Sequence, residues 1–298
     1  MTSASLATPA RIGCKPWLVI DVQHGLSNRL RAIASAATIA RHTDRALVVL
    51  WHPDHHCNCK ISDLLDYPGA VIEDDPGGVI RDDLDIVYSY MEVDEGHCYE
   101  KPILTDPASA GKSVFIRSAY SLISPHSRPD EERHFLKSLT PAEPVRDLIA
   151  PIRRPNQVAA HIRMGTGAGF NHLSYEAPDN WPAYRHADMT EWRIKSHDRH
   201  FMARVETLIE RGECDTLFLA ADLKETYERF ITRFGDRIAW LERDLFDRST
   251  RQLQYALADM ILLTAADRFL SSTSSSFSDL AKQLARPGRR TERSGIDF

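Results

Sequence analysis

The sequence predicts an α/β protein made of two Rossmann-like domains whose parallel sheets face each other across a cleft. Three observations support this: short β-branched runs, helical apolar stripes between them, and a proline-rich stretch near the middle of the 298 residues. Nearly continuous apolar runs are typical of strands covered on both faces. Their alternation with helices is typical of parallel sheets.

Eight runs are predicted to be strands, and three stripes with apolar residues at i, i+3/4 and i+7/8 are predicted to be helices. The strands are Trp17–Val22, Ala46–Trp51, Ile86–Tyr90, Val114–Ser118, Gln157–Ile162, Thr216–Ala221, Ile238–Leu241 and Arg268–Ser272. The stripes run through Leu30, Ile33, Ala37 and Ala40; through Phe201, Val205, Leu208 and Ile209; and through Leu253, Ala256, Leu257, Met260 and Ile261.

The chain is predicted to divide after residue 155. The segment Thr140–Pro155 carries four prolines, and such breaker-rich stretches mark loops and hinges. We therefore predict an N-terminal Rossmann-like domain over 1–155 and a C-terminal one over 156–298. The basic, Gly/Pro-bearing stretch Pro287–Arg293 is predicted to be a surface tail.

Composition narrows the function classes. The formal net charge is −5, with 43% hydrophobic and 27% charged residues, which is typical of a globular protein and argues against a general nucleic-acid binder. No apolar run reaches the ~18–20 residues that cross a bilayer, and the first residues lack a signal-peptide core. We expect no transmembrane segment, a cytoplasmic location and reduced thiols, because the five cysteines are odd in number and scattered.

The strongest candidate site is His161-Ile162-Arg163, at the end of a predicted strand. Residues two apart on a strand face the same way, so His161 and Arg163 share one face. Ligands of open α/β sheets bind beyond the carboxyl ends of the strands. The guanidinium fork of Arg163 suits phosphate oxygens, so the pair predicts an anion site. A packed histidine beside a surface arginine is the alternative.

Two further segments follow predicted strands. Ser271–Ser278 holds six serines and a threonine just before a predicted helix, and hydroxyls together with helix N–H groups can bind an anion. A single serine N-cap is the competing interpretation. Asp222 ends another strand, where its carboxylate could accept from a ribose or a guanine edge. Because Glu225 follows three residues later, a helix-capping role for Asp222 is equally open.

The turn after the first strand carries Gly25, Asn28 and Arg29. It resembles a phosphate-binding turn without matching either glycine-rich nucleotide motif. Ordinary turn and capping chemistry explains much of it. Arginines at the start of a helix are harder to explain structurally, because cations are unfavourable there.

Two other patterns are interpreted as non-functional. His52–Cys59 contains possible metal ligands, but no second cysteine pair stands at zinc spacing. The acidic run Asp82–Asp85 is predicted to be a solvated loop. We therefore expect no metal site.

Taken in order, these motifs resemble the GT-B fucosyltransferase superfamily, which includes the rhizobial nodulation and α1,6-, the α1,2- and the protein O-fucosyltransferases. The resemblance extends from Gly25 to Leu280. Gly25–Leu30 is similar to the family's first-strand turn and His161-Ile162-Arg163 to its His-x-Arg motif. Ala221-Asp222 resembles its acidic strand end and Ser275-Ser276-Phe277 its final serine-rich motif.

The resemblance implies an inverting, metal-independent transferase that moves fucose from GDP-fucose to a glycan or small acceptor, with the acceptor on the N-terminal domain and the donor on the C-terminal one. It needs no cofactor beyond the GDP-sugar co-substrate. Arg163 would neutralise the leaving diphosphate, which is the expected main catalytic term. His161 and Asp222 would hold the guanosine. The remaining donor contacts would be Gly25, Asn28, Arg29, Ser274, Ser275, Ser276 and Phe277.

The general base is assigned by no motif. Glu176 is our first candidate, followed by Asp179, Asp188 and Glu191, because the base should come from the loop after Arg163. Met164-Gly165-Thr166 also stands where the family commonly has a polar residue and an aspartate. Two alternatives therefore stay open: a GT-B transferase using another nucleotide sugar, and a catalytically idle nucleotide-sugar or glycan-binding protein.

Overall fold

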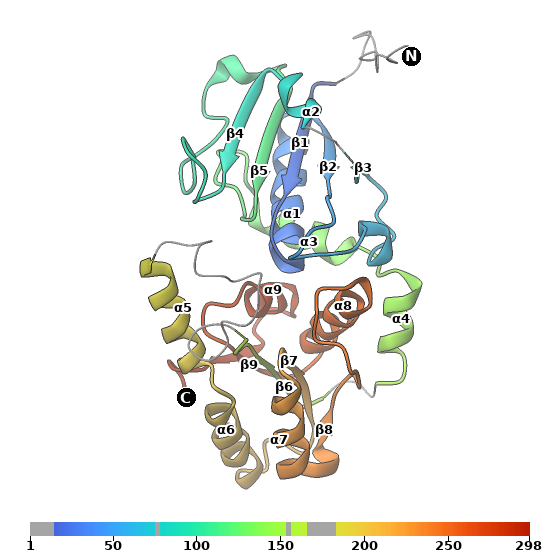
Figure 1. Cartoon of the computed structure of the whole chain (residues 1–298), viewed down its shortest axis with the longest axis vertical. Coiled ribbons are helices and arrows are strands. Elements are labelled where there is room, and N and C mark those ends of the chain that lie inside the picture. Colours follow the sequence, from blue (N-terminus) through green and yellow to red (C-terminus); the bar gives the residue numbers. More distant parts are fainter. Residues whose placement is uncertain (1–14, 75–77, 153–155, 166–182) are drawn as a thin grey trace.

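The structure consists of two five-stranded, all-parallel sheets, one from each half of the chain (Figure 1). It is a computed structural model that describes residues 15–74, 78–152, 156–165 and 183–298. The strand orders are β3-β2-β1-β5-β4 in the N-terminal half and β10-β9-β6-β7-β8 in the C-terminal half. The predicted α/β class with two parallel sheets is therefore confirmed.

All eight predicted strands form, with ends that differ by at most two residues, and two further strands complete the edges. β3 has only three residues, and β10 is polar and runs parallel to β9. The predicted tail over Pro287–Arg293 is thus wrong: its end is an edge strand with few apolar residues. The strands are β1 Trp17–Val22, β2 Ala46–Leu50, β3 Ala70–Ile72, β4 Ile86–Tyr90, β5 Val114–Ser118, β6 Val158–Ile162, β7 Leu217–Ala221, β8 Ile238–Ala239, β9 Arg268–Ser271 and β10 Arg290–Arg293.

The three predicted helical stripes lie in α1, α6 and α8. Within the described residues, no helix combines the length and apolarity needed to span a bilayer. The helices are α1 Leu26–His42, α2 Val79–Asp82, α3 Pro129–Ser138, α4 Glu143–Ile149, α5 Ala183–Lys195, α6 Asp198–Glu210, α7 Lys224–Phe234, α8 Thr250–Thr264 and α9 Ser276–Leu284.

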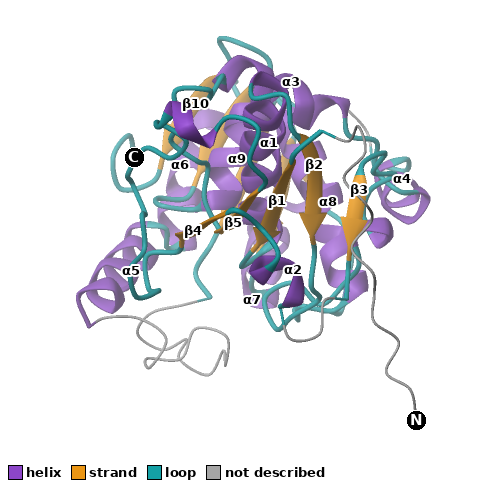
Figure 2. Ribbon diagram, turned by 90° about the horizontal axis from the view of Figure 1, so that it is seen from above, coloured by secondary structure: helices purple, strands orange, loops and turns teal. Residues whose placement is uncertain are grey.

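The two faces of the N-terminal sheet are covered unequally. Leu18 and Ile20 of β1 pack with the apolar residues of α1 in the main core, whereas Val19 packs in a small cluster that includes Ile80 of α2. Figure 2 shows α1 and α3 on one side of this sheet and the short α2 on the other.

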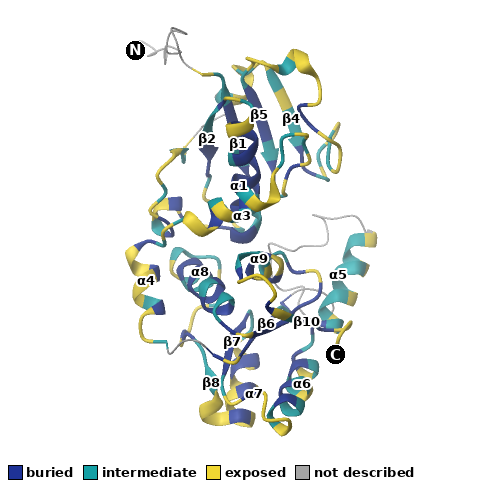
Figure 3. Cartoon of the chain, turned by 180° about the vertical axis from the view of Figure 1, so that it is seen from behind, coloured by how far each residue is buried: buried dark blue, intermediate teal, exposed yellow. Residues whose placement is uncertain are grey.

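The two halves are joined by an apolar contact. α1 and α3 pack against α9, and α4 packs against α8. One cluster of buried side chains runs from Ile20 in the first sheet, through Leu257 and Leu280, to Phe269 in the second. Figure 3 shows that buried residues lie in both sheets and in the helices between them. The predicted boundary between residues 155 and 156 stays a prediction, since residues 153–155 lie outside the described ranges.

Each sheet has a point where the strand order reverses direction, which is where a crevice forms at the ends of the strands. In the N-terminal sheet the chain runs outward from β1 through β2 to β3 and then resumes on the other side of β1, with β5 beside it. In the C-terminal sheet β6 is flanked in the same way by β7 and β9. Ligands of such sheets bind at these switch points, beyond the carboxyl ends of the strands.

Candidate functional site

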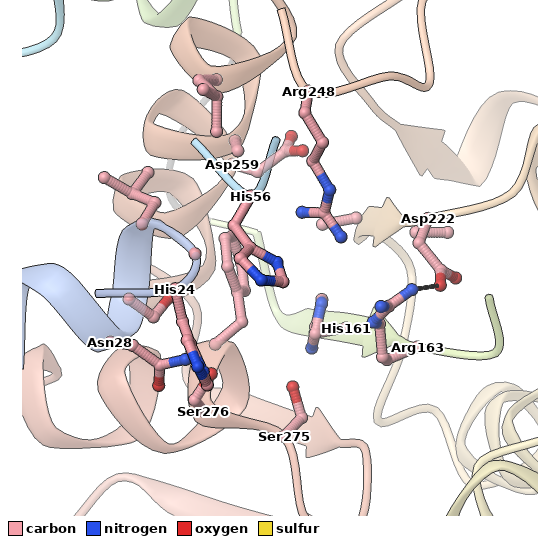
Figure 4. Close-up of a pocket in the computed structure, with 18 of the residues that line it drawn as sticks. His24, Asn28, His56, His161, Arg163, Asp222, Arg248, Asp259, Ser275 and Ser276 are labelled. Atoms are coloured by element: carbon pink, nitrogen blue, oxygen red, sulfur yellow. Dashed lines mark hydrogen bonds and ion pairs between the residues drawn. The ribbon is translucent and has the colours of Figure 1, made fainter. Parts of the chain in front are cut away.

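A cavity of about 390 Å³ lies at both switch points and is lined by residues from both halves (Figure 4). The N-terminal half contributes the turn after β1, His56 and Tyr120. The C-terminal half contributes the ends of β6 and β7 and the N-terminal parts of α8 and α9. The predicted site residues that line it are Gly25, Asn28, His161, Arg163, Asp222, Ser274, Ser275, Ser276 and Phe277.

The side chain of His161 is buried, lines the cavity and is held in one orientation by two neighbouring residues. Its Nδ1 lies 2.7 Å from Ser278 Oγ, and its ring stacks on Phe277 with centroids 4.6 Å apart. Burial lowers the pKa of His161 to about 3, although Asp222 acts in the opposite direction. Since Ser278 Oγ accepts from the backbone N–H of Ser272, its hydroxyl hydrogen can point to His161 Nδ1. The neutral ring then offers Nε2–H to a ligand.

Arg163 and Asp222 form an ion pair beside the cavity. Asp222 also accepts from the backbone N–H groups of Met164, at 3.0 and 3.1 Å, and of Gly165, at 2.6 Å. Burial by itself raises the pKa of Asp222, but the charge of Arg163 and these hydrogen bonds outweigh it and hold the pKa below its usual value. The carboxylate therefore positions Arg163 and the backbone of Met164 and Gly165.

This geometry gives Asp222 partners within the chain, and its predicted guanosine contact stays a prediction. Both of its oxygens already accept hydrogen bonds from within the chain, so the carboxylate is engaged with Arg163 and the backbone after β6. The side chain acts through Arg163. Sequence alone places Asp222 at the strand end but does not show that the N–H groups of Met164 and Gly165 meet its carboxylate.

The serine-rich segment serves both structure and the cavity. Ser275 caps α9, since its hydroxyl accepts from the N–H of Ser278, so the capping interpretation is confirmed for this residue. Ser272 donates to the carbonyl of His161 at 2.9 Å and accepts from the N–H of Arg163 at 2.9 Å. The first helical residue, Ser276, lines the cavity, where the N-terminus of α9 favours an anion.

Arg29 does not line the cavity, in contrast to the prediction. It is fully buried and donates to the carbonyls of His24 at 2.8 Å and His52 at 2.7 Å. It also pairs with Asp54 at 2.8 Å and lies 4.8 Å from the ring centroid of Trp51.

The arginine that faces the cavity from α1 is Arg31, which sequence reasoning missed. Its Nη2 donates to Asn28 Oδ1 at 2.8 Å, and no carboxylate pairs with it among the residues described. Burial lowers its pKa, although the charge of Asp279 opposes the shift, so an anion beside it would further stabilise the buried guanidinium.

A second missed residue is Asp259 on α8. Arg243 donates to Asp259 Oδ2 at 2.7 Å, whereas Oδ1 is buried and accepts no hydrogen bond within the described chain. Burial raises the pKa of Asp259 to about 6, although Arg243 opposes the shift. Asp259 lies in the cavity wall. The feature of the sequence that could have pointed to Asp259 is the placement of an aspartate next to Met260, within the apolar stripe of a predicted helix.

Two of the four base candidates are described by the structure. Glu176 and Asp179 fall outside the described residues. Asp188 and Glu191 lie on α5 and do not line the cavity; Glu191 pairs with Lys195. The α5 residues that do line it are Met189, Trp192 and Arg193.

The His52–Cys59 segment packs around Arg29. Trp51 Nε1 donates to the carbonyl of Cys59 at 2.8 Å, and the sulfurs of Cys57 and Cys59 lie 3.8 Å apart as free thiols. Among the described residues, no three His, Cys, Asp or Glu side chains gather as metal ligands.

The two facing parallel sheets and the cavity between their switch points define a GT-B-like fold. Solved fucosyltransferases share it. NodZ from Bradyrhizobium matches with a TM-score of 0.57 at 15% identity, over 91% of this chain and 94% of that chain. Arabidopsis thaliana FUT1 with GDP matches with 0.55 at 15%, over 96% and 73%. POFUT1 with GDP-fucose matches with 0.53 at 13%, over 96% and 99%.

In contrast to the fold, the sequence matches no family model, and no curated protein is significantly similar to it. At these identities the similarity is one of fold. The predicted resemblance to fucosyltransferase structures is confirmed at that level.

Proposed function

We propose that this protein is an inverting, metal-independent glycosyltransferase that transfers fucose from GDP-fucose to a glycan or small acceptor. The observation that carries the proposal is one cavity with a positioned arginine, a helix N-terminus and a buried carboxylate oxygen that accepts no hydrogen bond from the described residues. Structures of the same fold include NodZ soaked with GDP-fucose and POFUT1 in complex with it.

Diphosphate binding follows from the charges around the cavity. Arg163, held by Asp222, would meet the β-phosphate, and the first turn of α9 at Ser276 would offer N–H donors. As the bond between the sugar and the diphosphate breaks, negative charge grows on the leaving oxygen. A fixed guanidinium that needs no reorganisation stabilises that charge most in the transition state.

Guanine recognition is assigned to Asp259 in place of Asp222. A guanine base presents two neighbouring N–H donor groups, and Oδ1 of Asp259 is a buried acceptor in the cavity wall without a partner in the described chain. A buried acceptor is costly when unsatisfied. A guanine edge that donates a hydrogen bond to this oxygen would remove that cost. A base without N–H donors at the same place would leave the cost in full.

Thermal unfolding with GDP, UDP, ADP and their sugars, each with and without a chelator, tests the proposal. We expect GDP and GDP-fucose to raise the melting temperature, with no effect of the chelator, because only ligands of the folded state stabilise it. A shift with a different nucleotide would indicate another donor. A shift without release of GDP from GDP-fucose would indicate an idle binding protein, and no shift at all would contradict the proposal.

Substitution Asp259→Asn is expected to weaken GDP binding roughly tenfold or more, because a hydrogen bond to a charged group contributes about 1.5–3 kcal/mol. UDP binding should change much less. Titration calorimetry with both nucleotides measures the ratio. The matched control is Asp222→Asn, which should weaken both nucleotides alike. An unchanged GDP-to-UDP ratio in Asp259→Asn would refute the assignment of the guanine site.

A further inference from the structure

His24 lines the cavity with its backbone in an uncommon conformation. It lies two residues beyond β1, and its φ of 63° falls in the left-handed region that residues with a Cβ rarely adopt. Arg29 holds it there: Nε donates to the carbonyl of His24 and Nη1 to that of His52. Such conformations persist only where the surroundings impose them, and they cluster at functional sites.

The imidazole of His24 lies among other rings of the cavity wall. Its centroid is 5.1 Å from that of His56 and 6.4 Å from that of Tyr120. Burial lowers the pKa of His24, the charge of Asp54 raises it, and nearby cations lower it further. The ring is therefore uncharged at neutral pH, the form that can take up a proton. The cations are Arg29 and Arg117.

His24 and Arg163 lie on opposite sides of the cavity (Figure 4). One comes from the turn after β1 and the other from the end of β6, so the reacting sugar would lie between two halves of the molecule. In an inverting displacement the nucleophile attacks the face opposite the leaving group. A group that takes the proton of the nucleophile must therefore lie away from Arg163, as His24 does.

We propose that His24 is the general base that deprotonates the acceptor hydroxyl, an inference that rests on the proposed transfer from GDP-fucose. The hydroxyl oxygen forms the new bond to the anomeric carbon as the bond from that carbon to the diphosphate oxygen breaks. The electron pair leaves on GDP beside Arg163. The hydroxyl proton moves to an imidazole nitrogen of His24, which returns it to solvent after product release.

The test is His24→Asn, because asparagine tolerates left-handed φ but has no basic nitrogen. Hydrolysis of GDP-fucose serves as the reaction, with water in place of the acceptor and GDP release as the readout. We expect the rate to fall about 100-fold, the thermal shift with GDP to stay unchanged, and added imidazole to restore part of the rate. The control His55→Asn changes a neighbouring histidine that does not line the cavity and should keep the full rate.

The possible results distinguish a failure of the His24 assignment from a failure of the proposed function. A rate for His24→Asn within about threefold of wild type would overturn this inference and leave the proposed function standing. Loss of the GDP shift in the same variant would overturn it too, since His24 would then act in binding or folding. Absence of both GDP release and a GDP shift in the wild type would overturn the proposed function, and this inference with it.

Discussion

Replacing Arg163 by alanine is expected to lower the rate of GDP release from GDP-fucose by about 100- to 1,000-fold. Removal of one preoriented charge-stabilising group costs about 2.7–4 kcal/mol in the transition state. The fold should survive, because Asp222 keeps its two backbone N–H donors from Met164 and Gly165. We expect a stability loss of about 2 kcal/mol, within the 5–15 kcal/mol typical of a domain.

Steady-state kinetics together with circular dichroism measure both effects. Arg163→Lys is the informative companion, because it keeps the charge but loses the planar fork and should recover only part of the rate. Retained activity in a folded Arg163→Ala protein would remove Arg163 from the mechanism. Unfolding of the variant would instead indicate that its pairing with Asp222 is mainly structural.

Replacing Arg29 by methionine is expected to have the largest effect on stability, about 3–5 kcal/mol. The guanidinium is fully buried and joins two loops through the carbonyls of His24 and His52 and the carboxylate of Asp54. Methionine has similar length but leaves these three oxygens without their donor. Urea unfolding measures the loss as a lower midpoint with an unchanged slope.

Arg31→Met is the matched control on the same helix. Arg31 has no carboxylate partner among the described residues, and its charge is already disfavoured by burial. Its removal should cost about 1 kcal/mol or less but weaken GDP binding. If Arg29→Met proved as stable as Arg31→Met, the bonds made by Arg29 would contribute little to the fold.

The secondary structure was largely predictable, because its signals are local. Buried parallel strands need continuous apolar runs, and helices that cover them need a stripe every three or four residues. β10 escaped prediction because an edge strand with the sequence Arg290–Arg293 carries no such run. Its place beside β9 is set by backbone pairing.

The site was partly predictable for the same reason. His161 and Arg163 alternate with Ile162 on a strand, so their shared direction follows from the pleat. The position of Ser276 follows from the start of a helix after a strand. The sequence by itself therefore determined which strand ends and which helix N-terminus form the C-terminal side of the cavity.

Only the tertiary structure decided which polar groups are already satisfied. Asp222 and Asp259 both face the cavity, but both oxygens of Asp222 accept hydrogen bonds, whereas Oδ1 of Asp259 accepts none within the described chain. Arg29 and Arg31 are two residues apart on α1 and point in opposite directions, about 200° apart around the axis. Which direction is core and which is cavity depends on where β2 and α9 pack, and those contacts join segments far apart in the chain. Local sequence places donors and acceptors on elements, whereas long-range packing assigns each one its partner.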